Sequence, residues 1–187
     1  MRKLLLAALF CSSLAWAQTS LPSTLTSVEK SITGVQAGFL GISVYNESRF
    51  ANDIALRSSA NLNAGFWFGD EIESGFILAP ELSLEPKYYY NLERRARKGK
   101  STARNSGNYI SLDVKYFPDW FVISSEKDLN VLSSIGIVPT YGIRREFGSN
   151  FNYEFKVGFG YGFLLDSAYS SSASPLGNLS FKIGYDF

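Results

Sequence analysis

The stretch Leu179–Phe187, LSFKIGYDF, decides the fold of this chain. Its odd-numbered residues Leu179, Phe181, Ile183, Tyr185 and Phe187 are apolar or aromatic, and the residues between them are polar or small. Alternation with a period of two predicts a β-strand with one apolar and one polar face. A soluble protein rarely ends on such a strand, because chain termini usually fray into water.

This stretch resembles the C-terminal assembly signal of bacterial outer-membrane β-barrels, which close on an aromatic last residue. The resemblance implies an antiparallel transmembrane β-barrel that the barrel-assembly machinery inserts into the outer membrane. The runs Pro86–Leu92 (PKYYYNL) and Asn105–Tyr109 (NSGNY) are similar to an uncharacterised family of such barrels. Neither resemblance implies a reaction.

The other end of the chain predicts export. Residues Met1–Ala17 have the features of a secretory signal peptide: Arg2 and Lys3, an apolar core, and small residues before the expected cleavage at Gln18. The apolar run is shorter than the roughly 20 residues that a membrane-spanning helix needs. Cys11 suggests a lipoprotein as an alternative, but bulky Phe10 precedes it where lipoproteins carry a small residue.

The length of 187 residues fits a signal peptide and one domain. We expect a signal peptide over 1–17, a segment of uncertain structure over 18–31 and the barrel over 32–187. Cys11 is the one cysteine, so the exported chain is expected to have no disulfide. The formal net charge of +1 becomes −1 when Arg2 and Lys3 leave, which argues against a nucleic-acid binder.

Alternation predicts further strands along the chain. Asn152–Phe163, NYEFKVGFGYGF, gives the clearest pattern, and the others are 131–144, 108–117, 76–85 and 53–68. The segment 35–45 has strand composition, but both its faces carry apolar residues and it cannot be oriented. Because closed bacterial barrels have an even number of strands, from eight upward, we expect eight. The eighth is expected within 24–32, at a break within 50–68, or at 121–124.

If the apolar faces contact lipid, the polar faces point into the barrel. The expected interior charges are Asp53, Arg57, Glu81, Glu85, Asp113, Lys115, Arg144, Glu154, Lys156, Lys182 and Asp186. Eight strands leave an interior that side chains can just fill, so we expect a barrel filled by paired charges. A narrow ion path is the alternative, and the glycines of the polar faces would provide its gaps.

The connection over 86–107 is strongly basic. Its cations are Arg94, Arg95, Arg97, Lys98, Lys100 and Arg104, and Asn91 and Gly99 are expected to bound one short helix. A solvated loop is one interpretation. The other is contact with phosphate groups of lipid or lipopolysaccharide, or with an acidic envelope protein, because arginine binds two oxygens at once. Counting strands back from a periplasmic C-terminus places this connection in the periplasm.

An enzyme is not expected, because the chain contains no histidine and so lacks the usual general base of such barrels. No cofactor or metal is expected either, although Glu81 and Glu85 would remain available for acid–base work. We therefore expect a structural or interaction barrel in the outer membrane. The alternatives are a narrow, porin-like diffusion channel and a soluble periplasmic carrier of lipocalin type.

The segment Tyr116–Val122, which includes Trp120, gathers aromatic residues at the end of an expected strand. Tryptophan and tyrosine concentrate at headgroup depth in membrane proteins, so an interfacial girdle is the favoured interpretation. An exposed apolar patch for a protein partner is the alternative.

Overall fold

A computed structural model describes residues 26–67, 75–125, 131–165 and 173–187 of the chain. The expected signal peptide and most of the segment 18–31 lie outside the described residues. The strands are β1 (Ser31–Gly38), β2 (Gly41–Ala51), β3 (Ile54–Trp67), β4 (Gly75–Tyr88), β5 (Asn108–Phe117), β6 (Ile123–Ser124), β7 (Ser134–Phe147), β8 (Phe151–Leu164) and β9 (Ser174–Asp186). Between β4 and β5 lie the helix α2 (Leu92–Arg97) and the 3₁₀ helix η2 (Ala103–Asn105).

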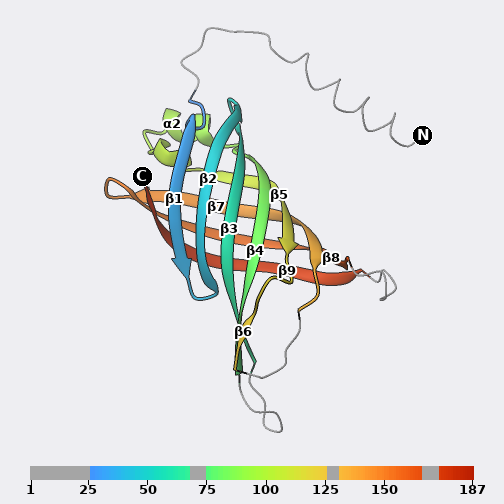
Figure 1. Ribbon diagram of the computed structural model, residues 1–187. Helices are drawn as coiled ribbons and strands as arrows, with labels where there is room; N and C mark the ends of the chain where they lie inside the picture. Colours follow the sequence, from blue (N-terminus) through green and yellow to red (C-terminus); the bar gives the residue numbers. More distant parts are fainter. Residues whose placement is uncertain (1–25, 68–74, 126–130, 166–172) are drawn as a thin grey trace, which may run out of the picture.

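Eight of these strands form a closed antiparallel ring in the order β1–β2–β3–β4–β5–β7–β8–β9 (Figure 1). Pairing of β1 with β9, from Gly34 with Asp186 to Gly38 with Lys182, closes it. The short strand β6 pairs with β4 outside the ring. The prediction of an all-β, antiparallel fold is confirmed, with eight strands in the ring and one short α-helix in a connection, and the arrangement is barrel-like.

Three places were expected for the eighth strand. The segment 121–124 contains β6, which lies outside the ring, and β3 runs without a break from Ile54 to Trp67. The remaining ring strand is β1, which overlaps the expected segment 24–32 only at its first two residues.

The segment 35–45 is not one strand but the hairpin of β1 and β2, in which Gly38 pairs with Gly41 across the two-residue turn Phe39–Leu40. A two-residue turn changes which residue parity faces outward, so Val35 of β1 and Val44 of β2 are both exposed. This change of parity explains why the segment looked apolar on both faces.

The two faces of the ring differ in polarity, in the opposite sense to a soluble protein. Large apolar side chains cover the outside, including Leu84, Ile110, Phe155 and Leu179. The fully buried side chains inside include Glu47, Glu85, Lys87, Arg144 and Glu154. Alternation along each strand therefore separates an apolar outer wall from a charged interior.

One end of the ring, here named the capped end, is covered by chain. It holds residues 26–30, the turns at 52–53 and 148–150, the connection 89–107 and the C-terminal residue (Figure 1). The Val28 N–H donates to Asn52 O at 2.8 Å, and Arg104 Nε donates to Ser149 O at 3.1 Å. The opposite end, which carries the β1–β2 turn, is named the open end.

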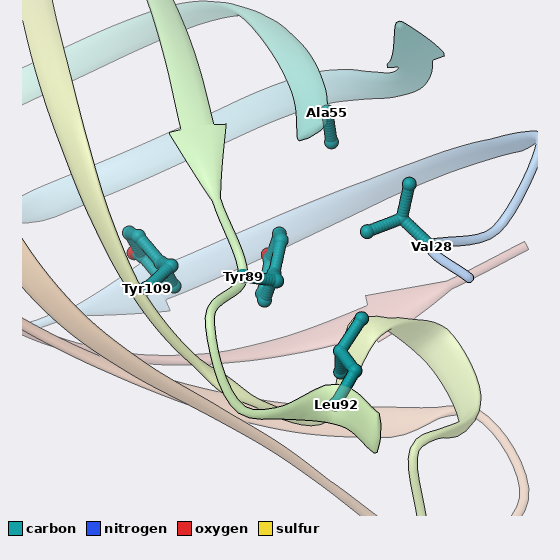
Figure 2. Close-up of a cluster of buried hydrophobic side chains, with 5 residues drawn as sticks. All are labelled: Val28, Ala55, Tyr89, Leu92 and Tyr109. Carbon is teal, nitrogen blue, oxygen red and sulfur yellow. The ribbon is translucent and has the colours of Figure 1, made fainter. Parts of the chain in front are cut away.

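A small apolar cluster lies at the capped end, between the ring and the connection that covers it. It consists of Val28, Ala55, Tyr89, Leu92 and Tyr109, all buried (Figure 2). Leu92 is the buried residue of α2, and Gly107 passes so close that an added Cβ would lie 2.8 Å from Leu92 Cδ2. The cluster therefore anchors the connection to the end of the ring.

Gly99 ends α2 as the sequence predicted, in the left-handed conformation with φ of 65°. Asn91 stands at the N-cap position without a capping hydrogen bond, because its side-chain oxygen accepts from the Asn108 N–H at 2.8 Å. In the described parts of the chain, no helix has the length and apolar character to cross a membrane.

Candidate functional site

The expected interior charges fall in two places. Most lie on the inner face of the ring: Arg57, Glu81, Glu85, Asp113, Lys115, Arg144, Glu154, Lys156, Lys182 and Asp186. Asp53 is the exception, because β3 begins one residue later and Asp53 belongs to the turn before it. There its backbone carbonyl accepts from the Tyr89 N–H at 2.8 Å.

Two fully buried charges, Glu47 and Lys87, were missed from the sequence. Glu47 lies on β2. The hairpin turn before β2 prevented the sequence pattern from showing which of its residues point inward. Lys87 lies on β4 beyond the predicted end at Glu85, because β4 continues through Pro86. The signal that would have found Lys87 is its position two residues after Glu85, on the same strand face.

Glu47, Arg57, Lys87 and Glu154 form an alternating cluster of charges across the ring. Arg57 donates to Glu47 Oε2 at 2.9 Å and to Glu154 Oε2 at 2.5 Å. Lys87 Nζ lies 2.7 Å from Glu154 Oε1 and 3.2 Å from Glu47 Oε2. Because buried ions need opposite charges to offset their lost hydration, these mutual contacts let the four groups occupy the interior.

A second buried pair lies nearer the capped end. Arg144 Nη2 donates to Asp186 Oδ2 at 2.8 Å and to Tyr45 Oη at 2.8 Å. Arg144 Nε donates to the backbone carbonyl of Arg104 at 2.8 Å, so this pair also holds the connection. Asn152 Nδ2 completes the group by donating to Asp186 Oδ1 at 3.0 Å.

The connection also reaches into the charged cluster. Tyr89 Oη and Asn105 Nδ2 donate to Glu47 Oε1 at 2.8 and 2.6 Å. Burial and the neighbouring Glu47 carboxylate raise the pKa of Tyr89 well above its usual range, so its hydroxyl keeps the proton that it donates. Asn105 adopts a left-handed conformation with φ of 58°, which asparagine tolerates better than most residues.

The half of the ring nearer the open end contains a cavity of about 590 Å³, named here the cup. Its charged lining consists of Arg57, Glu81, Asp113, Lys115, Glu154, Lys156 and Lys182. Within the cup Lys115 pairs with Glu81 at 3.1 Å, and Lys156 of the lining pairs at 2.5 Å with the fully buried Glu85, which does not line the cup. Arg57 and Glu154 of the charged cluster also line the cup, and of the described residues none in 89–107 does.

The basic residues of the connection lie at the capped end, the same end as the C-terminal residue. Arg94, Arg97, Lys98 and Lys100 are exposed. Arg95 is half-buried and donates to the Ser101 carbonyl at 2.9 Å. Arg104, also half-buried, bonds to the neighbouring turn as described above, so the exposed members are the ones accessible to a partner.

The expected assembly-signal residues lie on β9 and directly after it, on the outer face of the ring. Leu179, Phe181, Ile183, Tyr185 and Phe187 are all exposed. The aromatic ring of Phe187 contacts that of Tyr185, with centroids 5.5 Å apart. Trp120 and Phe121 are exposed as well, in the segment that leaves β5 toward the open end. Aromatic side chains therefore occur on the outside near both ends.

Comparison of the chain with protein-family models, with curated proteins and with solved structures finds no match. The functional argument therefore rests on the residues of this chain.

Proposed function

We propose that this protein is a non-catalytic outer-membrane β-barrel with a structural or interaction role in the cell envelope of a Gram-negative bacterium. One observation carries the proposal: a closed ring of strands has charged, mutually paired side chains inside and large apolar side chains outside. In hydrocarbon every backbone polar group needs a partner within the protein, and a closed ring provides one. The apolar side chains of the outer wall would then contact lipid instead of water, as they do in membrane-spanning barrels.

The ends of the chain support export and assembly by this route. Residues 1–17 have the pattern of a secretory signal peptide, and the aromatic outer face of β9 matches the resemblance to an assembly signal. With the C-terminus in the periplasm, the capped end faces the periplasm and the open end faces the exterior. Lipid and lipopolysaccharide then surround the outer wall, and the barrel-assembly machinery is the partner during insertion.

The contacts inside the ring favour a filled barrel over the porin-like alternative. The charged cluster spans the ring, and Tyr89 and Asn105 bond to it from the capped end. A diffusion path would have to pass these paired, dehydrated groups, and separating them is costly. A carrier of lipocalin type would need apolar side chains lining its interior, where this ring has charged ones.

The exposed cations of the capped end are where we place the interaction role. Arg94, Lys98 and Lys100 project from the connection that seals the ring, and Glu93 is engaged with Arg97 at 3.3 Å. A cationic surface beside the inner leaflet suits lipid phosphates or an acidic envelope protein.

The test is gel mobility of the outer-membrane fraction with and without boiling, followed by conductance in planar bilayers. A closed barrel resists detergent until heated, because it offers no unpaired edge. A heat-dependent shift together with an electrically silent barrel is the expected result. Stepwise conductance would favour the channel, and recovery in the soluble periplasm without detergent would overturn the membrane assignment.

A further inference from the structure

One cation that lines the cup, Lys182, has no acidic partner in the part of the chain that the structure describes. Lys182 Nζ has one hydrogen bond, to Ser43 Oγ at a long 3.4 Å, and no ion pair among the described residues. The other cations that line the cup, Arg57, Lys115 and Lys156, are each ion-paired. Lys182 is opposite Glu154 in the β8–β9 register, but the Glu154 carboxylate forms its ion pairs with Arg57 and Lys87.

Ion pairing, and not net charge, sets Lys182 apart from the other cations of the cup. Lys115 pairs with Glu81, Lys156 with Glu85, and Arg57 with Glu47 and Glu154. A half-buried cation gains by pairing with a carboxylate, which the described residues do not supply to Lys182. A ligand with a single carboxylate would provide this partner.

The remaining lining is suited to hydroxyl groups. Ser43, Ser59, Asn61, Asn63, Ser83 and Asn178 line the cup with groups that both donate and accept hydrogen bonds. Asp113 Oδ1 is buried beside them and has no hydrogen-bond partner among the described residues. A buried carboxylate oxygen without a donor is unfavourable, and a hydroxyl of the ligand would satisfy it.

We infer that the cup binds an acidic monosaccharide, with its carboxylate on Lys182 and its hydroxyls on the serine and asparagine side chains. The cavity of about 590 Å³ is within the usual range for small-molecule sites and admits a sugar with some ordered water. Phe117 lines the same cavity and offers an apolar surface to the C–H face of the sugar. This inference goes beyond the proposed function and does not depend on it, because the cup exists whether or not the outer wall contacts lipid.

The experiment is isothermal titration calorimetry of the full-length mature protein, folded in detergent micelles, with glucuronate as the probe. Glucose is the neutral control, and acetate is the control for a carboxylate without hydroxyls. We expect glucuronate to bind at least about ten-fold more tightly than either, the factor that one charge-assisted hydrogen bond provides. Equal affinities for glucuronate and glucose, or no heat with glucuronate, would overturn the inference.

Variants separate the site from general charge effects. Lys182→Met should weaken glucuronate binding at least about ten-fold, whereas Lys182→Arg retains most of it. Ser180→Phe should also abolish binding by filling the cup without changing its charge, since Ser180 lines it. Lys98→Met removes the same charge from the exposed capped end and should leave binding unchanged. Retained binding in Lys182→Met, with its heat-dependent gel shift intact, would contradict the inference even if the barrel assignment holds.

Discussion

Lys87 of β4 and Glu154 of β8 meet across the interior, with Nζ and Oε1 2.7 Å apart. Their strands are not neighbours, because β5 and β7 lie between them in the ring. Such contact is possible because eight strands enclose a space that side chains can span. The pair therefore ties together opposite walls that no backbone hydrogen bond joins.

Loss of Lys87 should destabilise the fold strongly. Lys87→Met leaves Glu47 and Glu154 buried with one cation fewer between them, and breaking a buried pair in this way costs about 3–5 kcal/mol. Urea unfolding of the refolded protein, followed by tryptophan fluorescence, measures the change. The matched control is Arg97→Met, which removes a pair whose arginine side chain is 70% exposed. Exposed pairs contribute little, so an equal shift in both variants would contradict a special role for the cluster.

A charge on the outer wall should be costly in lipid. Leu112 lies at the middle of β5 and is 41% exposed on the outer face. Leu112→Arg should lower the stability of the protein folded in lipid vesicles by about 2–4 kcal/mol if this face lies near the bilayer midplane. Ala96→Arg adds the same charge to the exposed surface of α2 and should have little effect. If Leu112→Arg leaves the stability of the protein in lipid vesicles unchanged, the outer wall does not contact lipid.

Strand alternation predicted most of the ring, because each outer face is apolar and each inner face polar over many residues. It failed at two local features. The turn Phe39–Leu40 exchanged the outward parity between β1 and β2, which concealed Glu47. Pro86 has no N–H to donate and coincides with a gap in the β4–β5 pairing, which hid the continuation of β4 to Lys87.

The partners of the interior charges could not be predicted. Alternation shows that Arg57 and Glu154 point inward, but their contact depends on how β3 and β8 are staggered across the ring, which no local pattern records. The contacts of the connection at the capped end could not be predicted either. The composition of the connection indicates a basic loop, whereas the burial of Tyr89 and Asn105 follows from contacts with Glu47, far away in the sequence.

The stability of the β1–β2 hairpin should depend on Gly41, the first residue of β2. Gly41 has φ of 127°, and an added Cβ would lie 2.2 Å from the Leu62 carbonyl oxygen. Gly41→Ala should therefore destabilise the protein by on the order of 1–3 kcal/mol, through backbone strain and displacement of β3. Gly177→Ala is the control, because nothing lies within 4 Å of its added Cβ. Equal urea midpoints for the two variants would show that the hairpin accommodates a side chain.

The last aromatic residue should matter for assembly more than for stability. Phe187 is 72% exposed and contacts Tyr185, so Phe187→Ala removes little buried surface from the folded ring. If the barrel-assembly machinery recognises the C-terminal strand, this change lowers the amount of protein in the outer membrane several-fold. The urea midpoint of the refolded variant should stay close to that of the original protein.

Phe151→Ala is the matched control for this experiment, because Phe151 is also exposed on the outer face and also contacts Tyr185, with centroids 5.3 Å apart. It lies outside the C-terminal stretch and should leave the outer-membrane level unchanged. A similar fall in both variants would indicate a general need for aromatic side chains at the capped end. A fall in the refolded stability of Phe187→Ala that matches its loss from the membrane would assign Phe187 to the folded ring instead of to recognition.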